Sequence, residues 1–238
     1  MTGPSTPRSR RERPAKPALT RAGIVAAAVD LLRAEDLQKV TMRRLAQELD
    51  TGPASLYVYF RNTAQLHAAI LDELLGTVEP VTAEGDWRVR LEKLLTAYTA
   101  MLFAYPGLAR AALTARPSGE HYLNLIETLL ALLAEGGVPG DQAAWGVDVL
   151  LQLATATAAE HAGHDRSADT QDEWDTLART LHEASARTHP HVAALSAQLI
   201  SGAPGDRLSW GLHTLITGIL HTPLPPARSD TWPPSAPS

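Results

Sequence analysis

The sequence predicts an all-α protein, and three features of it support this fold class. Between residues 18 and 221 apolar residues recur every three or four positions, as in Leu66, Ile70 and Leu74, which is the spacing of a helix face. Glycine and proline interrupt this pattern where helices would end, for example at 105–107 and 202–205. No stretch of strand length alternates between apolar and polar residues, so no sheet is expected.

The first two predicted helices lie near the N-terminus. Residues 24–32 form one, because Ile24, Ala28 and Leu31 fall on one helical face. The second runs through 41–49, with the Thr41 hydroxyl as a plausible N-terminal cap. Its Leu45, together with the small Ala46 beside it, would let another helix approach closely.

A turn at residues 50–52 separates this helix from a short one at 53–59, where Pro53 suits the first helical turn. The pattern turns Leu56 and Phe60 inward and leaves the rest of the short helix exposed. Exposed aromatic and small residues suit the major groove of DNA, where they meet base edges, thymine methyls and phosphates. This short helix lies beside Arg43, Arg44 and Arg61. Its expected exposed residues are Pro53, Ala54, Ser55, Tyr57, Val58 and Tyr59.

Longer helices are predicted for the rest of the chain. They cover residues 62–78, 91–102, 122–133, 141–161 and 205–221. The last two carry more apolar and small residues than a surface helix needs. This composition fits either simple core packing or pairing with the same two helices of a second subunit in a four-helix bundle.

Charge and composition divide the chain into four expected parts. Residues 1–65 hold 11 Lys and Arg against 6 Asp and Glu, whereas the remainder holds 10 against 20, so the positive charge is at the N-terminal end. With no cysteine and no long apolar run, a membrane or disulfide-linked protein is not expected, and a cytoplasmic location fits. The expected parts are a disordered basic arm (1–17), a helix-turn-helix domain (18–65), a helical ligand-binding and dimerisation domain (66–221) and a disordered proline-rich tail (222–238).

The motif T-x-R-x-L-A-x-x-L at 41–49, followed by L-Y-x-Y-F-x-N at 56–62, resembles the DNA-binding domain of tetracycline-repressor-type regulators. The resemblance implies three DNA-binding helices, a linking helix and a helical domain that binds a ligand and dimerises. It implies a repressor that binds a palindromic operator as a homodimer and is released by a small organic effector. The DNA-contacting residues that the resemblance and the exposed helix face indicate are Arg43, Pro53, Ala54, Ser55, Tyr57, Tyr59 and Arg61.

Four positions depart from the family pattern. Asp50 stands where the family usually has glycine in a left-handed turn, and Gly52 replaces a capping serine. Pro53 removes a polar contact, and Thr63 replaces a lysine that often binds phosphate. The N-terminal arm, with its five Lys and Arg residues, is either a compensating DNA contact or a solvated tail.

The C-terminal part also resembles the tetracycline repressor subgroup, at residues 86–88, 105–107, 113–118 and 211–213. The metal-and-ligand histidine of that subgroup corresponds to Ala112, and its polar pocket positions correspond to Leu94, Tyr98 and Thr128. Only Glu160 matches an acidic residue near that metal, so magnesium–tetracycline is not the expected ligand, and no metal or cofactor is expected.

A largely apolar or aromatic effector is expected instead, because aromatic side chains with one polar edge can enclose and orient an organic molecule. Any one of these residues could equally be core. A metal site at His161 and His164 is a weaker alternative, since such residues more often end a helix in solvent. The expected lining residues are Tyr98, Met101, Leu102, Tyr122, Trp145, Leu151 and Thr155.

Two other functions are alternatives to this one. An enzyme is not expected, because the sequence has no cysteine nucleophile, no G-x-S-x-G or H-E-x-x-H motif and no phosphate-binding glycine loop. A DNA-binding regulator without a small-molecule effector is the remaining alternative. A cavity of a few hundred Å³ inside the C-terminal domain would count against it.

Overall fold

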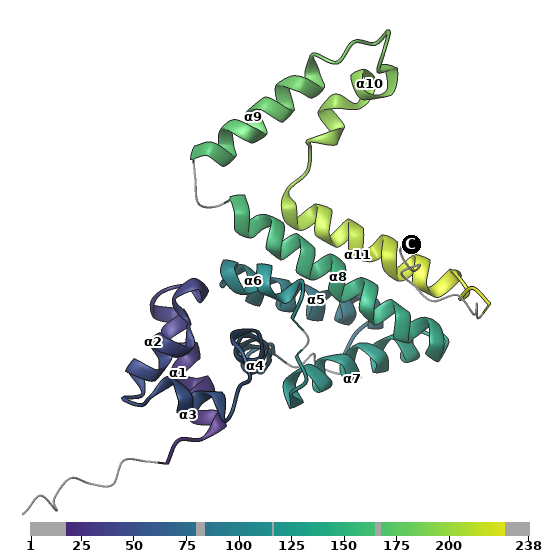
Figure 1. Ribbon diagram of the computed structural model, residues 1–238. Coiled ribbons are helices and arrows are strands. Elements are labelled where there is room, and N and C mark those ends of the chain that lie inside the picture. The colour runs from purple at the N-terminus through teal and green to yellow at the C-terminus, as the bar shows by residue number, and fades with distance from the viewer. Residues whose placement is uncertain (1–17, 80–83, 116, 165–167, 227–238) are drawn as a thin grey trace, which may run out of the picture.

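The computed structural model describes residues 18–79, 84–115, 117–164 and 168–226. In this part of the chain the predicted all-α fold is confirmed, with eleven α-helices and one 3-10 helix (Figure 1). The predicted N-terminal arm lies outside the described residues, as does most of the predicted tail. The helices are α1 (Arg21–Ala34), η1 (Leu37–Lys39), α2 (Met42–Glu48), α3 (Pro53–Tyr57), α4 (Thr63–Leu75), α5 (Trp87–Phe103), α6 (Pro106–Ala112), α7 (Glu120–Glu135), α8 (Gly140–His164), α9 (Ala168–His182), α10 (Pro190–Leu199) and α11 (Pro204–His221).

Helices α1, α2 and α3 form the N-terminal unit, and their boundaries follow the local chemistry of the sequence. The Thr41 hydroxyl accepts a hydrogen bond from the backbone N–H of Arg44 at 3.2 Å, which confirms the predicted cap of α2. Asp50 has a φ of 47°, so the left-handed turn predicted between α2 and α3 is present without a glycine. Pro53 occupies the first turn of α3, where its missing N–H leaves no hydrogen bond unmade.

Helix α4 links the N-terminal unit to the larger domain. Its Leu66, Ile70 and Leu74 are fully or almost fully buried, and α4 packs against α1 on one side and against α6 and α7 on the other. The two parts meet again where η1 lies against α6. There a side chain at Gly107 would come within 2.7 Å of the Asp36 carboxylate, so only glycine allows this approach.

The larger domain consists of α5, α6, α7, α8 and α11, and α8 contacts the other four helices (Figure 1). Its core is aliphatic, with Leu91, Leu102, Leu129 and Leu150 completely buried. None of the described helices combines the length and the apolar run that crossing a lipid bilayer requires.

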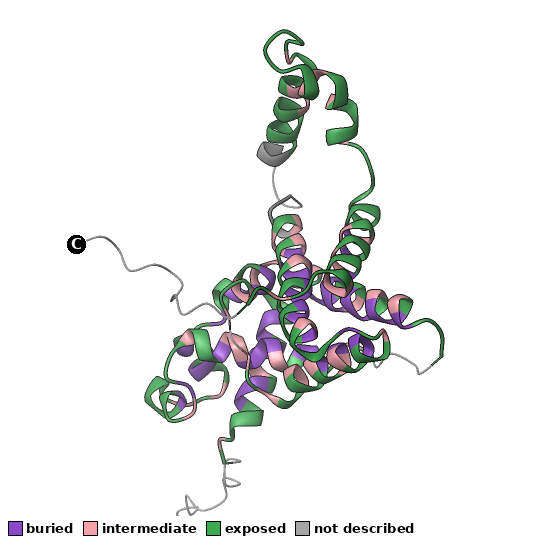
Figure 2. Cartoon of the chain, turned by 90° about the vertical axis from the view of Figure 1, so that its right-hand side faces the viewer, coloured by how far each residue is buried: buried purple, intermediate pink, exposed green. Residues whose placement is uncertain are grey.

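Helices α9 and α10 project from this body as a pair, and exposed residues cover nearly all of their surface (Figure 2). The sequence pattern did not separate these two helices from their surroundings, nor did it identify the short helix α6. Leu195 and Leu199 on α10 remain about half exposed, at 51% and 48%. The pair contributes no fully buried residue to the core among its described side chains.

The contact between α7 and α5 gives a stability test. A Cβ atom at Gly136 would overlap the buried indole of Trp87, whereas one at Gly140 would meet nothing within 4 Å. We predict that Gly136→Ala lowers the free energy of unfolding by about 1–3 kcal/mol, because the added methyl group overlaps the buried Trp87 ring. The control Gly140→Ala should be neutral or stabilise by up to about 1 kcal/mol. Urea unfolding measures both, and equal stability of the two variants would contradict this packing.

Candidate DNA interface and effector cavity

The outer face of α3 is exposed as the sequence predicts. Leu56 and Phe60 are buried, while Pro53, Ala54 and Ser55 are exposed. Beyond them Tyr57 is 53% and Val58 81% exposed, although both are large side chains that a folded protein tends to bury. A short helix held by two buried residues therefore presents aromatic, aliphatic and hydroxyl groups outward from one surface.

The arginines near this face have different surroundings. Arg43 at the start of α2 is exposed, as is Arg61 just after α3. Arg44 instead pairs with two carboxylates, those of Glu35 at 3.0 Å and Glu48 at 2.9 Å. Hydrogen bonds to these carboxylates raise the pKa of Arg44 and keep it charged, and the two carboxylates offset that charge within the protein. Arg43 and Arg61 are the better placed to meet an external anion.

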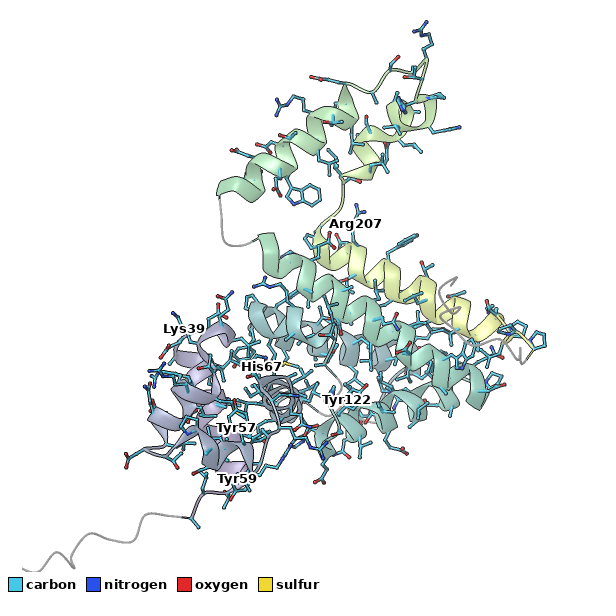
Figure 3. The ribbon with its side chains drawn as sticks, viewed as in Figure 1. Lys39, Tyr57, Tyr59, His67, Tyr122 and Arg207 are labelled. Atoms are coloured by element: carbon cyan, nitrogen blue, oxygen red, sulfur yellow. The ribbon has the colours of Figure 1, made fainter. Side chains whose placement is uncertain are left out.

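Tyr59 differs from the expectation of an exposed side chain. It follows the end of α3, is half-buried, and its hydroxyl donates a hydrogen bond to the carbonyl oxygen of Leu19 at 2.6 Å. Figure 3 shows Tyr57 and Tyr59 on the N-terminal unit. Tyr59 therefore joins the segment after α3 to Leu19, two positions before α1, a contact across forty positions that helical spacing does not reveal.

A cavity of about 610 Å³ lies inside the larger domain. Its volume is in the range of small-molecule sites. Side chains from α4, α5, α6, α7 and α8 surround it, so the helix that leaves the N-terminal unit forms part of the wall. The residues lining it are Leu71, Leu75, Tyr98, Ala112, Leu113, Ala115, Pro117, Tyr122, Ile126, Leu130, Ala144, Val147, Asp148, Leu151, Gln152, Thr155 and Ala156.

One buried polar pair interrupts the apolar wall. The Tyr98 hydroxyl on α5 and the Thr155 hydroxyl on α8 are 2.7 Å apart and hydrogen-bonded. Burial raises the pKa of Tyr98, so its phenol is neutral at physiological pH. Since each hydroxyl can both donate and accept, the pair can also bind a hydroxyl or carbonyl oxygen of a guest molecule.

The structure brings together four of the seven residues predicted for the effector site, namely Tyr98, Tyr122, Leu151 and Thr155. Met101 and Leu102 are buried but do not line this cavity. Trp145 is 59% exposed on the outside of α8, because a residue two positions from Val147 points away from the same wall.

The cavity wall also contains residues that the sequence did not predict for it, among them Leu71 and Leu75 of α4 and Ile126 and Leu130 of α7. The sequence predicted the two helices that carry these apolar residues. It could not show that α4 and α7 converge on one cavity, because that depends on long-range packing.

The positions matched to the tetracycline site are divided among three cavities. Ala112 lines the main cavity, Leu94 and Thr128 line one of about 320 Å³ beside α4, and Glu160 lines one of about 540 Å³ beside α9 and α11. His161 stacks near Phe103, with ring centroids 4.9 Å apart, whereas the side chain of His164 lies outside the described residues. Among the described residues, no three His, Asp or Glu side chains gather closely enough to hold a metal ion.

A helix-turn-helix unit joined by a shared helix to a hollow helical domain defines a class of ligand-binding transcriptional regulators. The family profile of bacterial regulatory proteins of the tetR family matches residues 24–70, and that of the tetracyclin repressor-like C-terminal domain matches residues 79–222. The chain belongs to the tetracycline repressor (TetR) family, whose members are DNA-binding regulators.

Several relatives and solved structures are similar along most of the chain. A Streptomyces transcription regulator, SCO7704, is 57% identical, with a TM-score of 0.77 over 90% of this chain and all of that one. ActR of Streptomyces coelicolor, in complex with actinorhodin, is 33% identical, with a TM-score of 0.76 over 86% of this chain and 96% of that one. The transcriptional repressor DrrR1 of Streptomyces coeruleorubidus is 28% identical over 86% of this chain and 78% of its own length.

The Tyr59 contact gives a test that separates a structural role from DNA contact. We predict that Tyr59→Phe lowers the free energy of unfolding by about 0.5–1.5 kcal/mol, because it removes the hydroxyl that donates a hydrogen bond to the Leu19 carbonyl. The control Tyr57→Phe, on the exposed face of α3, should leave stability unchanged. Chemical denaturation measures both variants. A Tyr59→Phe protein as stable as the wild type would show that the contact contributes nothing.

Proposed function

We propose that this chain is a repressor that binds a palindromic operator as a homodimer and leaves it when a largely apolar or aromatic molecule fills the main cavity. The observation that carries the proposal is the position of α4. It packs against α1 of the N-terminal unit, and its Leu71 and Leu75 line the cavity. A molecule that alters the cavity wall therefore acts on the helix that holds the DNA-binding unit.

DNA recognition is assigned to the exposed face of α3 and the neighbouring arginines. Arg43 and Arg61 suit phosphate or base contacts, and Ser55 and Tyr57 offer hydroxyls to base edges or phosphates. Pro53 and Ala54 are small enough to approach thymine methyl groups. Tyr59 remains part of the assigned interface, although its hydroxyl is already hydrogen-bonded within the protein.

The effector is assigned to the chemistry of the main cavity. Its wall is mostly aliphatic with two tyrosines, and the Tyr98–Thr155 pair is its buried polar group. A flat aromatic molecule with a few hydroxyl or carbonyl oxygens suits this lining. ActR binds actinorhodin in a related structure, which supports the same class for this chain. Ala112 supplies no metal ligand, so a magnesium–tetracycline complex fits this wall poorly.

The homodimer is assigned to the predicted helices 141–161 and 205–221, which correspond to α8 and α11. These helices pack side by side within one chain, and the Gln142 side chain donates a hydrogen bond to the Ile219 carbonyl at 2.8 Å. On their outer surface Trp145 and Val149 lie one turn apart on α8, and Trp210 of α11 is 72% exposed. Large exposed apolar residues of this kind favour burial against a second copy.

The alternative function is a regulator of the same family with no small-molecule effector. A close-packed larger domain would have favoured it. A cavity of about 610 Å³ with a wall from five helices favours an effector instead. Repression, rather than activation, is supported by the repressor DrrR1, which is similar along most of the chain.

Operator binding tests the DNA interface. We predict that Arg43→Ala and Tyr57→Ala each weaken specific binding at least about tenfold, because each removes a groove contact. Arg43→Ala should also make binding less dependent on salt, with a slope smaller by about one phosphate charge. Lys93→Ala on α5 is the control, since this exposed residue lies in the larger domain. Gel shifts with an operator selected from random DNA measure all three. Wild-type affinity in both interface variants would refute the assignment.

Filling the cavity tests the effector site. We predict that Ala112→Phe weakens the binding of actinorhodin at least about tenfold, because the ring occupies space that the guest needs. Operator binding without the guest should remain. The control Ala131→Phe adds the same ring at an exposed position of α7 outside the cavity. Calorimetric titration measures each affinity, and equal affinities in the two variants would place the effector elsewhere.

A further inference from the structure

The first turn of α7 is capped by a side chain from another helix. A helix begins with backbone N–H groups that have no partner inside the helix, and the side chain of the preceding residue often accepts one of them. The residue before α7 is Gly119, which has no side chain for this purpose. Asp72 of α4 supplies the acceptor instead, since its Oδ1 lies 3.0 Å from the backbone nitrogen of Tyr122. This hydrogen bond joins α4 directly to the start of α7.

Two glycines leave room for side chains at the contact between α4 and α7. A Cβ atom at Gly119 would overlap the Asp72 carboxylate, so glycine is required for this side chain to reach the helix end. One turn further along α4, Gly76 receives the imidazole of His121 in the same way, because a Cβ there would lie 2.8 Å from the ring. Two glycines, Gly76 just after α4 and Gly119 just before α7, therefore allow α4 and the first turn of α7 to touch.

Tyr122 connects this contact to the cavity. Its ring lines the cavity, while its backbone N–H donates to Asp72, and it lies at the end of α7 nearest α4 (Figure 3). On α4, Leu71 and Leu75 beside Asp72 line the same cavity. A guest that displaces the Tyr122 ring therefore acts on a residue whose amide is bonded to the helix of the DNA-binding unit.

We propose that Asp72 is the positioning residue that couples occupancy of the cavity to the helix-turn-helix unit. The start of α7 and α4 move together through the Asp72–Tyr122 hydrogen bond, and α4 packs against α1 of the N-terminal unit. This inference rests on the proposed function, because it assigns the route by which an effector reaches the DNA interface. Without the bond, the start of α7 loses its hydrogen-bonded link to α4, and a displacement of Tyr122 is passed to α4 less effectively.

Coupling between two sites is reciprocal, so the route can be tested without any effector. If Asp72 joins the two helices, binding of operator DNA to the N-terminal unit must change the amide hydrogen exchange of residues 120–126 at the start of α7. We expect a change of about fivefold or more in the wild type, within the usual range of coupling between sites. Asp72→Ala should reduce it to less than about twofold, since no acceptor remains.

Three further variants make this measurement specific. Asp72→Asn keeps an acceptor oxygen of the same shape and should retain the operator-dependent change. Glu73→Ala removes the adjacent exposed carboxylate and should also retain it. In Gly119→Ala the added methyl group displaces the Asp72 carboxylate from the start of α7, so this variant should lose the operator-dependent change. An operator-dependent change in Asp72→Ala or Gly119→Ala equal to that of the wild type would overturn the inference. So would its loss in Asp72→Asn.

A second measurement uses actinorhodin as the probe. We expect it to weaken operator binding of the wild type about fivefold or more, and that of Asp72→Ala less than about twofold, while both free proteins bind the probe alike. Equal release of wild type and Asp72→Ala would overturn the role of Asp72 and leave the proposed function standing. If actinorhodin does not release the wild type from the operator, this result counts against the proposed effector class. The hydrogen-exchange measurement then tests whether Asp72 couples the two helices. Failure of the wild type to bind any selected DNA would overturn both.

Discussion

Helix α4 is buried on two sides at once, and the rest of the structure depends on this constraint. It packs against α1 of the N-terminal unit through a face with fully buried side chains, while Leu71 and Leu75 line the cavity of the larger domain. A helix shared by two cores cannot move in one without disturbing the other, because protein interiors are close-packed. The fold therefore links the position of the recognition helix to the shape of the cavity.

The two surfaces that this helix connects have different chemistry. The α3 face is short, exposed and largely uncharged, and Arg44 beside it is already paired with Glu35 and Glu48. Such a surface suits recognition of groove shape and base edges more than general attraction to phosphates. The cavity is apolar apart from the Tyr98–Thr155 pair and a polar rim, and suits an organic guest that is held by shape.

The sequence predicted the parts of the structure that local rules determine. Apolar periodicity located α1, α4, α5, α7, α8 and α11, and cap and turn chemistry located the ends of α2 and α3. It failed for α9 and α10, which have little core to mark them. It placed Trp145 in the cavity, because spacing shows which residues share a face but not where that face points. The Asp72–Tyr122 bond spans fifty positions and follows only from the packed structure.

We propose that a guest in the cavity changes the separation of the two α3 helices in a dimer. Paired major-groove half-sites lie about 34–36 Å apart, so a shift of a few Å breaks the match to DNA. The sequence contains no cysteine, and Val58 beside α3 is 81% exposed, so Val58→Cys gives a unique spin label on each subunit. Pulsed electron paramagnetic resonance then measures the distance between the two labels. We expect a single distance that shifts by several Å when saturating actinorhodin is added. An unchanged distance, with the guest bound, would contradict the claim.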